Sequence, residues 1–222
     1  MTITTFEYCS LHYLNQWLTY DRGYCQDLSS CNKEVKLSAL ERAGAFYGVA
    51  RNLPTKFDVK KNVKRYQPVL EILDAVSKEQ FNDDPVNTVN RILEIEREIS
   101  AKYGDKRVLS LTTKFLWLKI KEPILIYDSQ ARIAVGSKDG DLADYYNKWG
   151  KGFTKHQKQI EKVSSRLSEL NLYAVDQEVG TKECINDVSS KTWFHKRIFD
   201  IYLWNKGNNS LTTAGSAAKT KV

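Results

Sequence analysis

The sequence predicts an all-α protein. Apolar residues recur every three or four positions through most of the chain, as at Val86, Val89 and Leu93, and this is the period of an amphipathic helix. Strand signals are nearly absent, since only residues 124–127, four apolar residues after a proline, resemble a strand. A chain of 222 residues suits one domain, or two small helical lobes that share a core.

Start and stop signals delimit the expected helices. Asp84-Pro85 is a start signal, because a capping residue precedes a proline in the first helical turn, and this helix should end at Gly104. Other helices are expected at 33–51, 68–76, 108–120, just after 128, from 141, at 154–170 and at 186–204. Residues 208–222 are rich in Ser, Thr, Gly, Ala and Lys. Their composition predicts a disordered tail after a helical domain at 1–207.

Composition excludes several classes of protein. Hydrophobic residues make up 41% of the chain and charged residues 27%, as in a globular protein with a solvated surface. No apolar run approaches the roughly 20 residues that cross a bilayer, and the first residues do not resemble a signal peptide. We therefore expect a cytoplasmic protein without membrane contact. The four cysteines form no Cys-x-x-Cys pair and the three histidines are scattered, so no metal site or other cofactor is expected.

The formal net charge of +7 favours a polyanionic partner. Cations recur every three or four residues in the region around 148–166, where the expected helix would turn them outward. Such a pattern can be an ordinary solvated helix face or a surface that follows DNA phosphates, and the basic balance of the chain favours DNA. Trp149 lies among these cations and is a candidate stacking platform for a base. The candidate phosphate ligands here are Lys148, Lys151, Lys155, Lys158 and Lys162.

Lys114 lies in an expected helix, 108–120, that is apolar on most of its faces. Helices of this kind are usually buried inside a domain. Burial disfavours the charged form of a lysine, and an amine that is partly neutral can act as a nucleophile. The alternative is that the lysine extends its ammonium group to the surface along apolar neighbours.

Asp128 stands between an apolar segment and the start of an expected helix. A structural interpretation is that its carboxylate caps the helix by accepting hydrogen bonds from the first free amides. A carboxylate held in this way is rigid, so it can also stabilise a developing oxocarbenium cation or position a water molecule against it. The two interpretations are compatible.

Two segments carry a resemblance to a known family. Leu111-Thr-Thr-Lys-Phe-Leu-Trp-Leu118 and, after a short connection with a proline, Ile126-Tyr-Asp-Ser-Gln-Ala-Arg132 resemble the catalytic segment of helix-hairpin-helix DNA glycosylases, in particular the 8-oxoguanine-glycosylase-like branch. The resemblance implies a two-lobed helical fold, with Lys114 matching the lysine nucleophile and Asp128 the catalytic acid. Residues 199–204 are similar to the final helix of divergent members.

The chain departs from that family at the hairpin. The family's Gly-x-Gly turn, whose amides hold a phosphate, is replaced by Arg107-Val-Leu-Ser-Leu-Thr-Thr113. Hydroxyl groups of Ser110, Thr112 or Thr113 would then bind the phosphate, with Arg132 as a further DNA contact. The base pocket is expected to include Trp117 and Tyr127 as well as Trp149.

The resulting expectation is a monomeric DNA glycosylase. It would flip a modified base out of double-stranded DNA and cleave the N-glycosidic bond, leaving an abasic site, with Lys114 adding lyase activity in a bifunctional variant. Divergent members of the family excise hypermodified bases such as glucosylated hydroxymethylcytosine from phage DNA, so the resemblance also points to phage defence. The alternative is a non-enzymatic helical DNA-binding module in which Asp128 is only a cap.

Overall fold

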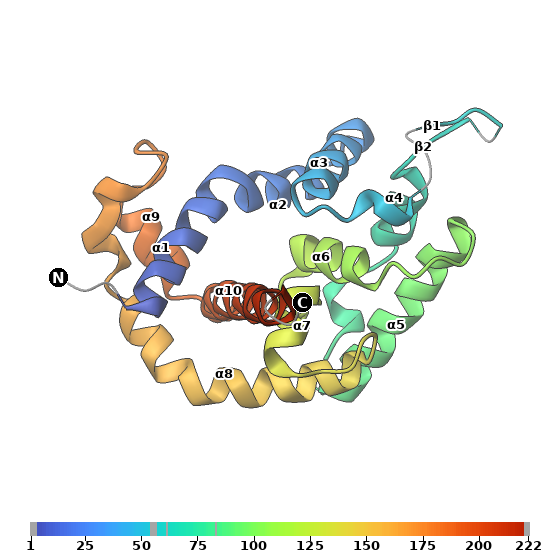
Figure 1. Ribbon diagram of the computed structural model, residues 1–222. Helices are drawn as coiled ribbons and strands as arrows, with labels where there is room; N and C mark the ends of the chain where they lie inside the picture. The colour runs from blue at the N-terminus through green and yellow to red at the C-terminus, as the bar shows by residue number, and fades with distance from the viewer. Residues whose placement is uncertain (1–3, 54–56, 61, 83, 220–222) are drawn as a thin grey trace. The chain divides into compact units, whose positions relative to one another are not determined.

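The computed structural model describes residues 4–53, 57–60, 62–82 and 84–219, with side chains for all of these except 52, 57 and 209–219. The described residues are mainly helical, and their only strands are two short ones (Figure 1). The prediction of an all-α protein is therefore confirmed. The chain divides into two compact units: unit 1 comprises residues 1–19 and 128–222, and unit 2 comprises residues 20–127.

Unit 2 contains a helix that is buried on most of its faces. α6 (Leu109–Ile120) packs against α2 (Arg22–Leu28) and α5 (Pro85–Lys102), and nine of its twelve residues are buried. The backbone N–H of Val108 donates to the Glu96 carboxylate of α5 over 2.8 Å, which fixes the start of α6. The other elements are α3 (Lys33–Phe46), α4 (Gln67–Asp74), the antiparallel pair β1 (Phe57–Asp58) and β2 (Val63–Lys64), and 3-10 turns at Ala50–Asn52 and Lys78–Gln80.

Unit 1 is organised around its last helix, α10 (Thr192–Lys219), drawn in red in Figure 1. α10 packs against α1 (Thr5–Gln16), α7 (Ser129–Val135) and α8 (Leu142–Ser164). The unit also contains a 3-10 segment, Leu167–Tyr173, and α9 (Lys182–Ser189). A π-helical turn, Trp17–Asp21, continues from α1 into unit 2.

α8 differs from the two helices that the sequence predicted, one from 141 and one at 154–170. It is one continuous helix from Leu142 to Ser164, and the 3-10 segment follows it. Gly150 and Gly152 lie inside α8 without interrupting the helix. At Gly152 an added Cβ would lie 3.0 Å from the ring of Phe199. The missing side chain therefore allows α8 and α10 to approach closely, and tertiary packing overrides a weak helix propensity.

Three further differences concern the ends and the connections. The sequence analysis does not predict the helix at Thr5–Gln16, although Thr4 and Glu7 form a capping box there. Residues 124–127 are buried but form no strand. The helical backbone of α10 continues to Lys219, whereas the side chains of 209–219 and all of 220–222 lie outside the described residues. The disordered tail at 208–222 therefore stays a prediction.

No helix among the described residues is both long and apolar enough to cross a bilayer.

α7 and α10 meet at a point where only glycine fits. A Cβ added to Gly207 would lie 2.1 Å from the backbone oxygen of Gln130, in the first turn of α7. Backbone cannot move aside as a flexible side chain can, so Gly207 determines how closely the start of α7 packs on α10.

Gly207→Ala is expected to destabilise the protein by about 3 kcal/mol, because the new methyl group must push the two helices apart. The measurement is urea unfolding followed by circular dichroism. Gly150→Ala is the matched control in α8, where nothing lies within 4 Å of an added Cβ. It should leave stability unchanged or raise it by about 0.5–1 kcal/mol. Equal effects of the two substitutions would contradict the close approach.

Candidate functional site

Asp128 caps α7, as the sequence predicted. Its backbone is extended (φ −120°, ψ 143°), and its carboxylate oxygen Oδ1 accepts a hydrogen bond from the backbone N–H of Gln130 over 2.9 Å. The side chain is partly exposed, while residues 124–127 before it are buried. The same turn of α7 is held against α10 at Gly207. The carboxylate is therefore fixed in position and is partly exposed, so a substrate can reach it, and a charge that is fixed in advance is what the stabilisation of a cation requires.

A buried ion pair lies in the core of the same unit. One carboxylate oxygen of Asp200 accepts a hydrogen bond from Arg197 Nη1 and the other from Trp149 Nε1, each over 2.8 Å. The guanidinium of Arg197 also lies over the ring of Tyr13, 5.0 Å from its centroid. This network joins α8 to α10, and reasoning from the sequence did not find it. Trp149 and Asp200 are 51 positions apart in the sequence, so no periodic pattern pairs them.

Asp128 lies within electrostatic reach of this network. Burial raises the pKa of Asp200, Arg197 opposes that rise, and the negative charge of Asp128 adds to it. Burial, and then the charges of Asp200 and Asp128, raise the pKa of the fully buried Tyr145 well above its usual value. The capping carboxylate thus stands beside a second, interior acid. Clusters of this kind are common at functional sites, although structural ion pairs produce them too.

α8 carries a row of exposed lysines. Lys151, Lys155, Lys158 and Lys162 follow one another at spacings of four, three and four residues, so they lie along one face of the helix. Tyr145, Trp149, Phe153 and Ile160 are buried on the opposite face. Among the residues that the structure describes, none of the four lysines forms an ion pair. We call these four residues the lysine row; it spans about 16 Å along the helix axis.

Two other predicted cations are engaged within unit 1. Lys148 Nζ donates to the carboxylate of Asp144 over 2.8 Å and to the carbonyl of Gly136 over 2.7 Å. Arg132 donates from Nη1 to the carbonyl of Ser137 over 3.1 Å, and its Nε lies 3.4 Å from a carboxylate oxygen of Asp139. Both side chains stabilise the turn between α7 and α8, so they are less available to DNA than the lysine row.

Lys114 belongs to unit 2 and is buried, with 4% of its surface exposed. Its ammonium group donates to the hydroxyl of Ser110 over 3.0 Å and lies 5.7 Å from the ring centroid of Tyr47. The side chain does not extend to the surface, so of the two sequence interpretations the structure supports burial.

The predicted hydroxyl donors are also inside unit 2. Thr112 and Thr113 are fully buried, and their hydroxyls donate to the carbonyls of Val108 and Leu109 over 3.1 Å. Thr113 Oγ1 also accepts a hydrogen bond from the N–H of Tyr127 over 3.0 Å, which brings these two predicted residues together. In this conformation neither threonine presents its hydroxyl to a phosphate.

The three aromatic residues assigned to a base pocket are core residues. Trp117 in α6 is 2% exposed, Tyr127 is 6% exposed, and Trp149 in unit 1 is 2% exposed. A ring buried in a core cannot stack on a base without rearrangement, so the structure does not favour these roles. Within the described ranges, no group of three or more His, Cys, Asp or Glu side chains is placed to hold a metal ion.

Asp200→Asn is expected to destabilise the protein by about 3–5 kcal/mol, because it leaves the guanidinium of Arg197 buried without a counter-charge. Asp187→Asn is the matched control, since Asp187 forms an exposed ion pair with Lys191 on the surface of the same unit. Its loss should cost less than about 1 kcal/mol. Chemical unfolding monitored by tryptophan fluorescence measures both. A loss at Asp200 no larger than that at Asp187 would show that the buried pair is not a structural requirement.

Comparisons with known proteins identify no similar protein. No family model, no curated protein and no solved structure matches the chain. The chemistry of the site is therefore argued from the residues themselves: the fixed, accessible carboxylate of Asp128 and, in the same unit, the lysine row of α8.

Proposed function

We propose that the protein is a DNA glycosylase that hydrolyses the N-glycosidic bond of a modified nucleotide. The observation that carries the proposal is that unit 1 combines a rigid, accessible carboxylate, Asp128, with the lysine row of α8. Cations without ion-pair partners on one helix face are suited to a phosphate backbone. The resemblance of residues 111–118 and 126–132 to helix-hairpin-helix glycosylases supports the reaction class. It also supports a hypermodified base of phage DNA as the substrate.

In this reaction the bond between C1′ of the sugar and the base nitrogen breaks, and its electron pair leaves with the base. The sugar then carries an oxocarbenium charge, which the carboxylate of Asp128 stabilises. A water molecule adds its oxygen to C1′ and gives a proton to Asp128, while the departing base takes a proton from solvent. The products are a free base and an abasic site.

Lys114 is the weaker part of the proposal. A lyase step would need its amine to leave Ser110, lose a proton and reach the sugar. With 4% of the side chain exposed, this requires a rearrangement of unit 2. We therefore favour hydrolysis by Asp128 without a covalent intermediate.

A second function, a non-enzymatic DNA-binding module, is favoured by the burial of the predicted pocket residues. Trp117, Tyr127 and Trp149 are core residues and offer no open stacking surface to a flipped base. In that case Asp128 would be a cap alone, and the lysine row would remain the DNA contact.

Asp128→Asn is expected to abolish base release, because asparagine still caps a helix but carries no negative charge. Duplexes containing 8-oxoguanine, uracil or hydroxymethylcytosine derivatives, together with phage DNA, are incubated with protein and treated with alkali to reveal abasic sites. Asp141→Asn is the matched control, since Asp141 caps α8 in the same way, through the N–H of Asp144. It should retain full activity.

Base release by the Asp128→Asn protein would overturn the mechanism. Binding without strand breaks on every substrate would favour the DNA-binding module. Borohydride reduction during the reaction tests Lys114 separately: a covalent protein–DNA adduct that disappears in Lys114→Gln would show the bifunctional reaction, and we expect none.

Replacing the lysine row should reduce the salt dependence of duplex binding. Each phosphate contact contributes about 0.9 to the slope of log affinity against log salt, so single Lys→Gln changes should lower the slope by about 0.9 and the fourfold change by about 3.6. Fluorescence anisotropy at several salt concentrations measures it. Lys182→Gln, an exposed lysine of α9 outside the row, is the control and should leave the slope unchanged. An unchanged slope in the fourfold variant would remove the row from the interface.

A further inference from the structure

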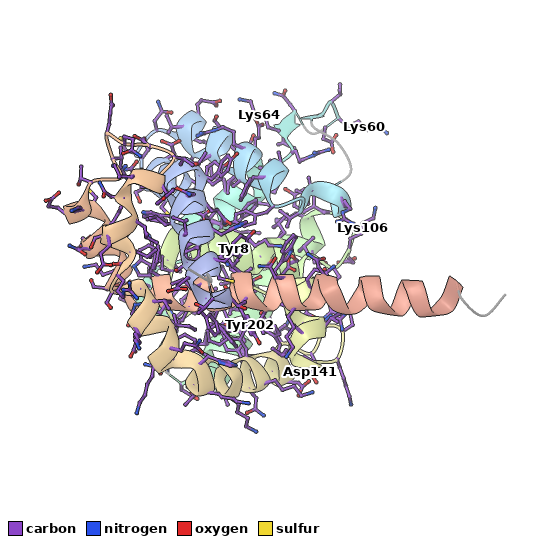
Figure 2. All side chains as sticks on the ribbon, turned by 60° about the vertical axis from the view of Figure 1, so that its left-hand side comes forward. Tyr8, Lys60, Lys64, Lys106, Asp141 and Tyr202 are labelled. Carbon is purple, nitrogen blue, oxygen red and sulfur yellow. The ribbon has the colours of Figure 1, made fainter. Side chains whose placement is uncertain are left out.

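An aromatic cluster in unit 1 reaches the surface between α1, α8 and α10. Tyr202 of α10 lies 4.9 Å from Phe6 and 5.6 Å from His156, measured between ring centroids, and Phe6 lies 5.3 Å from His156. Phe199 lies beneath them, 5.8 Å from Tyr202 with nearly parallel rings. Phe6 and Phe199 are buried, whereas His156 and Tyr202 are partly exposed. Figure 2 shows Tyr202 on the side of α10 that faces α8.

Two exposed lysines flank this aromatic rim of His156 and Tyr202. Lys155, a member of the lysine row, precedes His156 in α8, and Lys206 lies one helical turn after Tyr202 in α10. Burial lowers the pKa of His156, and the charges of Lys155 and Lys206 lower it further. Both cations therefore act on the imidazole of His156, and its lowered pKa favours the neutral form.

Two features of this edge bear on what it binds: the rings of His156 and Tyr202 are partly exposed, and the charges of Lys155 and Lys206 reach the imidazole. Proteins bind unpaired nucleotides with aromatic rings and neighbouring cations, because the base packs on the rings while the adjoining phosphates meet the cations.

We propose that the aromatic rim of His156 and Tyr202, with Lys155 and Lys206, binds an unpaired nucleotide of single-stranded DNA. The base packs against the exposed parts of the Tyr202 and His156 rings, and the flanking phosphates contact the two lysines. The proposal deepens the proposed function and rests on its DNA-binding part, since Lys155 belongs to the lysine row. It gives the protein a contact for the strand that a modified or mispaired site leaves unpaired.

The test compares binding of a fluorescein-labelled single strand of mixed sequence with binding of the corresponding duplex, by anisotropy, with the full chain. Tyr202→Leu is expected to weaken single-strand binding about tenfold, within the range for loss of one stacking ring, and to change duplex binding less than twofold. Tyr202→Phe keeps the ring and should bind normally. Trp204→Leu is the matched control, because Trp204 is an exposed aromatic residue of α10 outside the ring cluster.

Equal losses in the Tyr202→Leu and Trp204→Leu proteins, no loss in either, or an equal loss for the duplex would each overturn the proposal. If Tyr202→Leu unfolds, His156→Leu decides in its place, with the same expected selective loss. The outcome is separate from that of the base-release assay. Base release without Tyr202-dependent binding refutes only the rim, whereas Tyr202-dependent binding without base release refutes only the glycosylase.

Discussion

The arrangement of unit 1 depends on the buried carboxylate of Asp200. Burying a charge is unfavourable unless a partner of opposite charge and further hydrogen bonds compensate for it, and Arg197 and Trp149 supply both. The resulting network fixes α8 against α10, while Gly207 lets α7 approach α10 from another side. The capping carboxylate of Asp128 and the lysine row are therefore presented by helices that share one support. A site that holds a cationic transition state needs this rigidity, because its charges must be in place before the reaction begins.

Sequence patterns predicted the features that local rules determine. The period of apolar residues located α5 and α6, and the Asp-Ser step before α7 identified Asp128 as a cap. Local rules also indicated the burial of Lys114, though they left open where its ammonium group would point. The same rules could have located α1, since Thr4 and Glu7 form a capping box.

Features that depend on distant contacts could not be read in this way. Trp149 looked exposed because lysines surround it in the sequence, yet its indole is fixed by an acid on another helix. The sequence divided α8 into two helices, because the ring of Phe199 that Gly152 accommodates is 47 positions later. The aromatic rim joins residues from two helices, and neither His156 nor Tyr202 has a sequence neighbour that reveals the other. One sequence contains no information that pairs such positions.

The order of the two units along the chain has a consequence for folding. Unit 2 is one continuous segment, whereas unit 1 is built from two segments, 1–19 and 128–222. Phe6 and Cys9 of α1 contact Tyr202 and Asn205, and the second pair is separated by 196 positions in the sequence. Contacts so far apart in sequence form slowly, because a long loop must close before they contribute. During synthesis, the apolar face of α1 therefore stays uncovered until α10 has been made, and exposed apolar surface of this kind is prone to aggregation.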